Sequence, residues 1–177
     1  LLFTNLFSQD SKDISLLANW DPDTLPKSGG IHYNEIWGYV DCQGLEYAIM
    51  GSAGFVHFFN LTDENEFNEI AYFEGGNVTT WRDHKTYKNR SYSVCDGCTE
   101  GMMIFNLESL PDSVIKVKQT DEFFSKAHNI YIDEANGKLY AVVTNNQGDG
   151  IIILDISEDP DNPTLWARHD LPGGYIH

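Results

Sequence analysis

Polar side chains that could bind a ligand recur along this chain at a nearly constant spacing. The first set steps by 48, 46 and 49 residues and comprises Asn34, Arg82, His128 and His177. The residues that follow three of these form a second set, Glu35, Asp83 and Asn129. Histidine and carboxylate together suit a divalent metal ion, whereas an arginine favours an anionic or carboxylate ligand. If the fold brings the two sets together, they form either a ligand site or a group of polar side chains that satisfy one another.

Local motifs of catalysis do not occur in the sequence. The chain contains no G-x-S-x-G, no H-E-x-x-H and no phosphate-binding G-x-x-x-x-G-K-[ST]. Histidines and acidic residues are numerous enough that some acid–base pair is always possible, so their presence alone decides nothing. The sequence therefore gives no catalytic residue, and a protein without enzymatic activity is the first hypothesis.

Cysteine chemistry is limited to three residues, Cys42, Cys95 and Cys98. The Cys95-x-x-Cys98 spacing is compatible with a redox pair, with half of a zinc site, or with a disulfide across a small loop. No second C-x-x-C or paired histidine completes a zinc site, and no βαβ pattern supports redox chemistry. We expect a Cys95–Cys98 disulfide and a free Cys42, because the repeat described below places Cys42 and Cys95 on opposite faces of the fold.

Acidic turns are a further candidate for binding. They lie at 159–162, 133–137 and 145–150 and are rich in oxygen ligands of the kind that Ca²⁺ requires. None matches the twelve-residue EF-hand loop. Ca²⁺ is thus the one cofactor that the sequence suggests, and solvated turns without a bound ion are the alternative.

An internal repeat decides which elements must position these residues. Three segments share a glycine, an apolar run and then Asn or Asp, at Asn60, Asn106 and Asp155. A second set of landmarks, Tyr47, Tyr92 and Tyr140, gives the same period of 45 to 49 residues. Each unit contains short runs rich in Val, Ile, Tyr and Phe that are bounded by turn residues, as in Asn136-Gly137.

This period predicts an all-β fold, a β-propeller of four-stranded antiparallel blades. We expect blades over about 31–79, 80–126 and 127–174, the start of a fourth blade at 175, and an N-terminal arm or signal-peptide remnant over 1–13. Leu16 to Asp21 resembles the last strand of a unit, so we expect it to form an outer strand. Three blades do not close a ring, so the ring is expected to be incomplete, with the inner-strand residues around its channel mouth.

Composition excludes several kinds of partner. Across 177 residues, Lys plus Arg is 11 and Asp plus Glu is 27, giving a net charge of −16. Nucleic acids and anionic lipid surfaces both require a basic face, so neither is expected as a partner. No run approaches the ~20 apolar residues of a membrane-spanning helix, and 41% hydrophobic residues is too apolar for a disordered acidic segment.

The repeat motifs resemble those of the choice-of-anchor B proteins, which carry LVIVD-type repeats. The similarity rests on segments 33–39, 81–83, 127–134 and 171–177, and on the run Gly150-Ile151-Ile152-Ile153-Leu154-Asp155-Ile156. It extends from about Ile14 to His177. The resemblance implies a secreted or cell-surface β-propeller within a longer, C-terminally anchored chain, and it implies no particular chemistry. Cys95-Asp96-Gly97-Cys98 departs from the pattern, because a loop without cysteine is expected there.

Two hypotheses on function follow. The first is a secreted or cell-surface propeller that acts as a non-enzymatic module for binding, adhesion or matrix assembly. The second is a propeller that binds a metal ion or an anion, or an enzyme, with its site at the channel mouth. Expected partners are further blades of its own chain, a second copy, or another protein. Three N-x-[ST] sequons, at Asn60, Asn77 and Asn89, are candidates for glycosylation.

Overall fold

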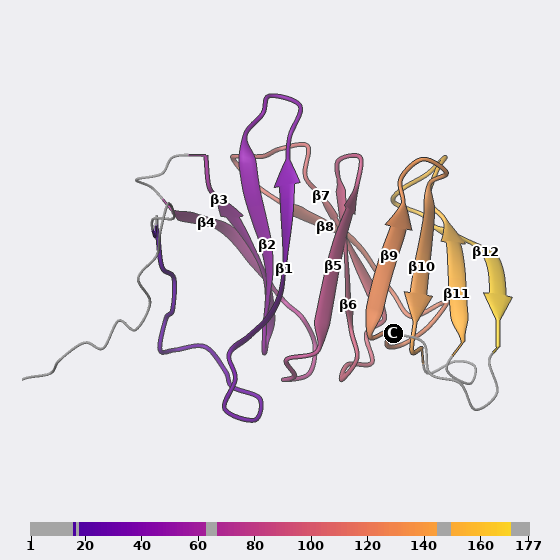
Figure 1. The fold of residues 1–177 in the computed structure, drawn as a ribbon, viewed down its shortest axis with the longest axis horizontal. Coiled ribbons are helices and arrows are strands. Elements are labelled where there is room, and N and C mark those ends of the chain that lie inside the picture. The colour runs from indigo at the N-terminus through magenta and orange to yellow at the C-terminus, as the bar shows by residue number, and fades with distance from the viewer. Residues whose placement is uncertain (1–15, 17, 63–66, 145–149, 171–177) are drawn as a thin grey trace, which may run out of the picture.

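The computed structural model describes residues 16, 18–62, 67–144 and 150–170. All regular structure in these ranges is β-strand, and within each sheet every strand pairs in antiparallel fashion with the next along the chain (Figure 1). The strands are β1 (Tyr33–Val40), β2 (Glu46–Ser52), β3 (Phe55–Asn60), β4 (Asn68–Glu74), β5 (Arg82–Tyr87), β6 (Arg90–Cys95), β7 (Met102–Asn106), β8 (Ile115–Thr120), β9 (Asn129–Asp133), β10 (Lys138–Val142), β11 (Ile151–Asp155) and β12 (Thr164–His169).

These strands form three four-stranded sheets in the orders β1-β2-β3-β4, β5-β6-β7-β8 and β9-β10-β11-β12. We call them blades one, two and three. Their first strands contact each other in sequence, β1 with β5 and β5 with β9, so the inner edges of the three blades lie side by side (Figure 1). The predicted all-β fold of four-stranded antiparallel units is therefore present.

The same irregularity occurs at the same place in every blade. The register between the third and fourth strands shifts at Phe58/Phe59, at Ile104/Phe105 and at Ile153/Leu154. A β-bulge increases the local twist of a strand pair. The outer strand of each blade is therefore twisted by a β-bulge at the same position. The sequence repeat is matched by a repeat in backbone geometry.

The repeated glycine before each third strand has a steric cause. A side chain at Gly101, where φ is 74°, would overlap the carbonyl oxygen of Thr120 at the end of β8. At Gly150 it would overlap the carbonyl oxygen of His169 at the end of β12. Only glycine allows the two backbones to approach so closely in blades two and three. In blade one a side chain at Gly54 would instead overlap the ring of Pro26.

Two apolar clusters join the blades face to face. Ile49, Val56 and Phe58 of blade one pack with Met103 and Phe105 of blade two. A second cluster joins blade two to blade three through side chains that include Tyr92, Ile104, Ile130, Leu139 and Leu154. Because side chains alternate along a strand, each blade presents one set to the preceding blade and the other set to the following one.

The outer strand predicted over Leu16 to Asp21 is wrong for the residues described there, since residues 16 and 18–21 form no strand. Trp20 instead packs on blade one, with its ring centroid 5.0 Å from that of His57 and 4.9 Å from that of Phe59. A strand needs a neighbouring edge to bond with, and burial of an indole ring on an aromatic surface stabilises this segment without one. None of the described segments forms a helix that could cross a membrane.

Candidate functional site

The inner-strand residues point into the interfaces between blades. Arg82 and Asp83 are adjacent on β5, so their side chains leave opposite faces of blade two. Arg82 reaches blade one and Asp83 reaches blade three, and both are almost completely buried. These two candidate residues therefore act at two different blade interfaces.

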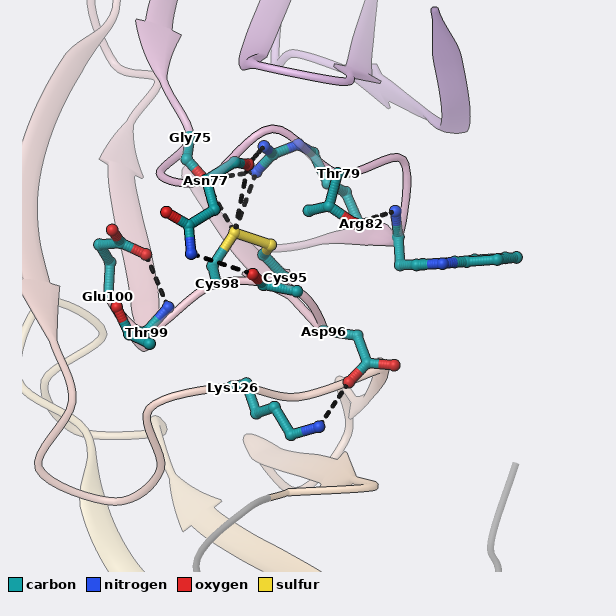
Figure 2. Close-up of a disulfide and its surroundings, with 12 residues drawn as sticks. Gly75, Asn77, Thr79, Arg82, Cys95, Asp96, Cys98, Thr99, Glu100 and Lys126 are labelled. Carbon is teal, nitrogen blue, oxygen red and sulfur yellow. Dashed lines mark hydrogen bonds and ion pairs between the residues drawn. A yellow bond between two sulfur atoms is a disulfide. The ribbon is translucent and has the colours of Figure 1, made fainter. Parts of the chain in front are cut away.

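Arg82 is enclosed by main-chain carbonyl groups (Figure 2). Its Nε donates to the carbonyl oxygen of Ser52 at 2.7 Å, and Nη1 donates to that of Gly75 at 2.5 Å. Nη2 donates to the carbonyl oxygens of Ala53 and Asn77, each at 3.1 Å. Burial lowers the pKa of Arg82 to about 10, so it keeps its charge at neutral pH. With its donors occupied and 2% of its surface exposed, this guanidinium is not positioned to bind an external anion.

A disulfide lies against this arginine. Cys95 and Cys98 are bonded to each other with a Cα–Cα distance of 5.4 Å, and Cys42 is free and exposed. The Sγ atom of Cys98 lies 3.2 Å from the carbonyl oxygen of Gly75, which also accepts from Arg82 (Figure 2). The disulfide thus holds a loop of blade two against the connection between β4 and β5, which is a structural role.

The second set of candidate residues is brought together through Lys85. The Nζ atom of Lys85 lies 2.5 Å from Asp83 and 3.5 Å from Glu35. The other carboxylate oxygen of Asp83 accepts the backbone N–H of Ile130 at 2.7 Å and the amide of Asn129 at 3.3 Å. Burial and the nearby Asp83 raise the pKa of Glu35. These groups form a hydrogen-bonded series across all three blades.

The first set is not gathered into one ring in the described residues. Asn34 donates to the carbonyl oxygen of Arg82 at 3.3 Å. His128 lies at the other interface, with Nδ1 3.0 Å from a carboxylate oxygen of Asp96 and its ring 5.9 Å from that of Trp81. His177 lies outside the described residues.

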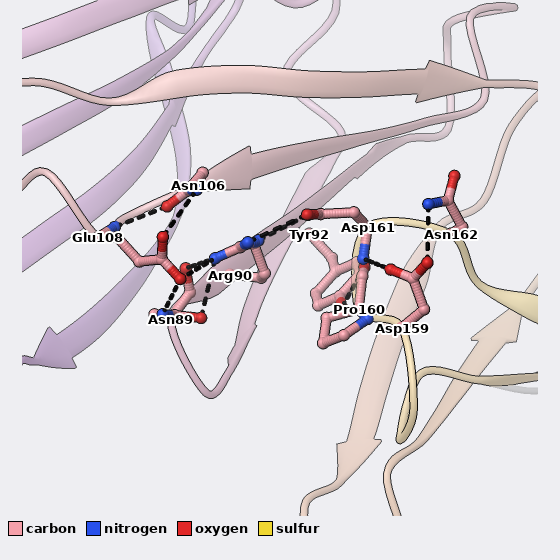
Figure 3. Close-up of polar contacts among 9 residues, drawn as sticks. All are labelled: Asn89, Arg90, Tyr92, Asn106, Glu108, Asp159, Pro160, Asp161 and Asn162. Atoms are coloured by element: carbon pink, nitrogen blue, oxygen red, sulfur yellow. Dashed lines mark hydrogen bonds and ion pairs between the residues drawn. The ribbon is translucent and has the colours of Figure 1, made fainter.

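The acidic turn at 159–162 is bonded to the protein itself (Figure 3). Arg90 makes a two-point contact with Asp161, at 2.6 and 3.0 Å, which raises the pKa of the guanidinium. Asp159 accepts from the amide of Asn162 at 2.9 Å, and Tyr92 donates to the carbonyl oxygen of Pro160 at 2.8 Å. This turn therefore fastens blade three to blade two.

The other acidic turns give less information. Asp133 accepts from the amide of Asn136 at 2.7 Å, so the turn at 133–137 is closed on itself. Residues 145–149 lie outside the described part of the chain. Within that part, no three His, Cys, Asp or Glu side chains are grouped to hold a metal ion.

The three sequons occupy different surroundings. Asn77 is exposed in the connection between β4 and β5, and its amide donates to the carbonyl oxygen of Gly97 at 3.3 Å (Figure 2). Asn60, at the end of β3, and Asn89, in the β5–β6 turn, are half-buried. Asn89 also donates to Glu108 at 2.5 Å. Asn77 is thus the sequon whose side chain is most open to modification.

A Ser–His–Glu series on blade one was not found from the sequence. His57 Nδ1 lies 2.5 Å from Glu69 Oε1, and its Nε2 lies 2.8 Å from Ser52 Oγ. Burial lowers the pKa of His57, and this outweighs the opposing effect of Glu69. The order of atoms is that of a serine-hydrolase triad, but Ser52 is fully buried, so no acyl substrate reaches its hydroxyl. Only the alternation of Phe55, His57 and Phe59 along β3 could have indicated this cluster.

A buried histidine at the first interface was also missed. His84 has no exposed surface, and its Nδ1 lies 2.8 Å from Ser93 Oγ. Burial, reinforced by the charges of Arg82 and Lys85, lowers the pKa of His84 to about 3. This histidine is therefore neutral and structural at physiological pH.

Comparison with known proteins adds no family to this geometry: a scan against protein-family models found no match, and neither did a search of curated proteins.

Proposed function

We propose that this chain is part of a β-propeller that serves as a non-enzymatic module for binding or assembly. The single observation that carries the proposal is an apolar surface on blade three in which Tyr131 is exposed and Tyr140, Val142, Ile151 and Ile153 are half-buried. We call this surface the blade-three face. Membership of the choice-of-anchor B family stays a proposal, supported by the agreement between the sequence repeat and the three repeated sheets.

Register and packing define the blade-three face. Tyr131, Tyr140 and Ile153 are directly opposite one another on β9, β10 and β11. Their sequence neighbours Ile130 and Leu139 are buried against blade two, so these three side chains leave the sheet on the other side. Tyr131 keeps 65% of its surface exposed.

The repeat indicates what such a surface does in the other blades. Tyr92 and Ile104 of blade two occupy the positions of Tyr140 and Ile153, and both are buried against blade three. The equivalent surface of blade one is likewise buried against blade two. We therefore expect the blade-three face to be covered by a further blade, a second copy of the chain or another protein.

Two features support a secreted or cell-surface location. A disulfide between Cys95 and Cys98 persists most readily in an oxidising compartment. Asn77 presents an exposed sequon, as expected of a protein that passes through a glycosylating pathway. The net charge of −16 also favours a partner other than nucleic acid.

The proposal is tested by measuring the mass of the 177-residue chain by light scattering, together with binding of a dye that reports apolar surface. We expect a mass above 20.0 kDa or strong dye binding, and Ile153→Asp should reduce both. Leu165→Asp is the matched control, because Leu165 is 47% exposed on β12 but lies opposite Leu154, whose side chain faces blade two. A monomer that binds no dye and is unaffected by Ile153→Asp would show that the face needs no partner.

A further inference from the structure

A pocket on blade one combines aromatic rings with a single carboxylate. It has a volume of about 340 Å³ and lies between the segment at residues 20–25 and the outer strands β3 and β4. We call it the Trp20 pocket, and its principal lining residues are Trp20, Leu25, Phe55, His57, Glu69 and Tyr72. Its size is at the lower end of the range for small-molecule sites.

Aromatic rings surround the imidazole of His57. The ring of Trp20 lies 5.0 Å from it, that of Phe55 5.9 Å and that of Tyr72 6.2 Å. Phe55 and Tyr72 also meet edge to face at 5.6 Å, and Tyr72 remains 61% exposed. Aromatic faces attract cations, and indole does so most strongly. The walls of the Trp20 pocket therefore suit a positively charged group.

The carboxylate of Glu69 provides the opposite charge. His57 is 2% exposed and lies between Ser52 and Glu69, so it serves as a neutral donor to Glu69 Oε1 and an acceptor of the Ser52 hydroxyl. Glu69 thus presents a carboxylate to the pocket, where its side chain is 27% exposed. Among described residues, His57 is the partner of this carboxylate.

The arrangement selects one class of cation. A guanidinium binds a carboxylate best through two parallel hydrogen bonds, and one oxygen of Glu69 is already used by His57. A bare ammonium brings three N–H donors that aromatic walls do not satisfy. A trimethylammonium group has no N–H donor and presents apolar methyl groups that carry the positive charge.

We propose that the Trp20 pocket binds a trimethylammonium group, with Trp20, Phe55 and Tyr72 around its methyl groups and Glu69 balancing its charge. This site is separate from the blade-three face, and its test does not depend on assembly. The same chemistry is presented by a choline headgroup and by the side chain of trimethyllysine.

The test is calorimetric titration of the 177-residue chain with choline and with 3,3-dimethylbutan-1-ol, its uncharged analogue of the same shape. We expect choline to bind at least about tenfold more tightly than the alcohol, because the alcohol loses the attraction to the rings and to Glu69. Equal affinities, or no binding of choline up to about 10 mM, would overturn the proposal.

Matched variants locate the binding. Glu69→Gln should weaken choline binding at least about fivefold and Trp20→Ala about tenfold or more. Glu134→Gln removes the same charge from the exposed β9–β10 turn of blade three, and Trp166→Ala removes an exposed tryptophan from that blade; both should bind as the unaltered chain does. If Glu134→Gln weakened binding as much as Glu69→Gln, the effect would be one of net charge and the site would be wrong.

A second variant guards against misfolding, since Trp20 also packs on Phe59. Tyr72→Ala alters an exposed ring and should weaken choline binding at least about threefold with an unchanged unfolding temperature. Binding unaffected by both Trp20→Ala and Tyr72→Ala would refute the pocket. Phosphocholine and free trimethyllysine, titrated in parallel, distinguish a lipid or small-molecule source from a modified protein.

Discussion

Replacement of Arg82 by lysine should destabilise the chain far more than an arginine-to-lysine change usually does. The four carbonyl oxygens around Arg82 are contributed by Ser52, Ala53, Gly75 and Asn77 and receive donors from three different nitrogen atoms. A lysine ammonium carries at most three N–H donors on one atom, and it is more strongly hydrated than a guanidinium. It therefore leaves at least one carbonyl group without its donor and costs more to bury.

The magnitude follows from those contacts. A hydrogen bond to a charged group contributes about 1.5–3 kcal/mol, and lysine loses one or two of the four. Ala53 is the least affected, because its carbonyl oxygen also accepts the N–H of Thr79 at 2.8 Å. We expect Arg82→Lys to lower the free energy of unfolding by about 3 kcal/mol. For a chain of this length, this corresponds to a fall of about 6–12 °C in Tm.

Urea unfolding followed by circular dichroism measures this loss. Arg168→Lys is the matched control, because Arg168 is exposed and makes one bond, at 3.2 Å, to the carbonyl oxygen of Phe123. The control should change the free energy of unfolding by less than about 0.5 kcal/mol. If the two variants differed by no more than that, the carbonyl cage around Arg82 would not stabilise the interface and the reasoning would fail.

Three further changes test other contacts. Replacing Cys95 and Cys98 by serine opens a loop of four residues, since the cysteines are three positions apart. The chain-entropy relation predicts that the free energy of unfolding falls by about 1.9 kcal/mol. An unchanged Tm would contradict this prediction. Asp161→Asn weakens the two-point contact with Arg90. The free energy of unfolding, measured in urea, should fall by about 1 kcal/mol. An unchanged value would mean that water screens the contact and that it does not stabilise the fold. His84 has a pKa of about 3 in the folded chain against about 6.5 when unfolded, so the unfolded state takes up a proton first as the pH falls and stability declines below about pH 6.5. His84→Asn should remove about 3 kcal/mol of the decline between pH 7 and 4.5, and an equally steep decline in the variant would show that other groups cause it.

The repeat was predictable from the sequence because it is local. Glycine before each third strand and Asn or Asp at the end of that strand recur at equivalent positions in every blade. The second-strand tyrosines mark the strand less exactly, because Tyr92 and Tyr140 lie opposite Ile104 and Ile153, whereas Tyr47 lies opposite Asn60. These landmarks depend on contacts within one blade or with the next blade. One period of the sequence therefore contains most of what is needed to predict the repeated unit.

The candidate site was less predictable than the repeat. The alternation of side chains along a strand predicts which face of the sheet each residue lies on, but it does not predict what packs against that face. Arg82 and Asp83 do point in opposite directions, as their adjacency on one strand requires. In blade two each sheet face meets another blade, so Arg82 and Asp83 are used for contacts between blades.

The Trp20 pocket could not be derived from the sequence for a different reason. Trp20, His57 and Glu69 share no motif, and the segment that carries Trp20 was expected to form a strand. Its position depends on the aromatic surface of β3, which attracts the indole ring in the absence of a strand partner. Such tertiary contacts override local similarity to a repeat unit.

The polar contacts between blades also indicate what a partner of the blade-three face must supply. Apolar clusters stabilise both observed interfaces but are not directional, whereas each interface also contains a charged group with fixed hydrogen-bond partners. In blade two that group is Asp83, which accepts the backbone N–H of Ile130 from the following blade at 2.7 Å. Asn129 holds the same position in blade three, and its Oδ1 atom is buried without a hydrogen-bond partner among the described residues. A buried acceptor left in this state costs about 1–3 kcal/mol. That oxygen lies at the existing interface with blade two, where the amide of Asn129 donates to Asp83. A partner that covers Tyr140 and Ile153 should bring a charged group of its own with fixed hydrogen-bond partners, as Asp83 does for Ile130, and this requirement separates a specific partner from one that merely buries apolar surface.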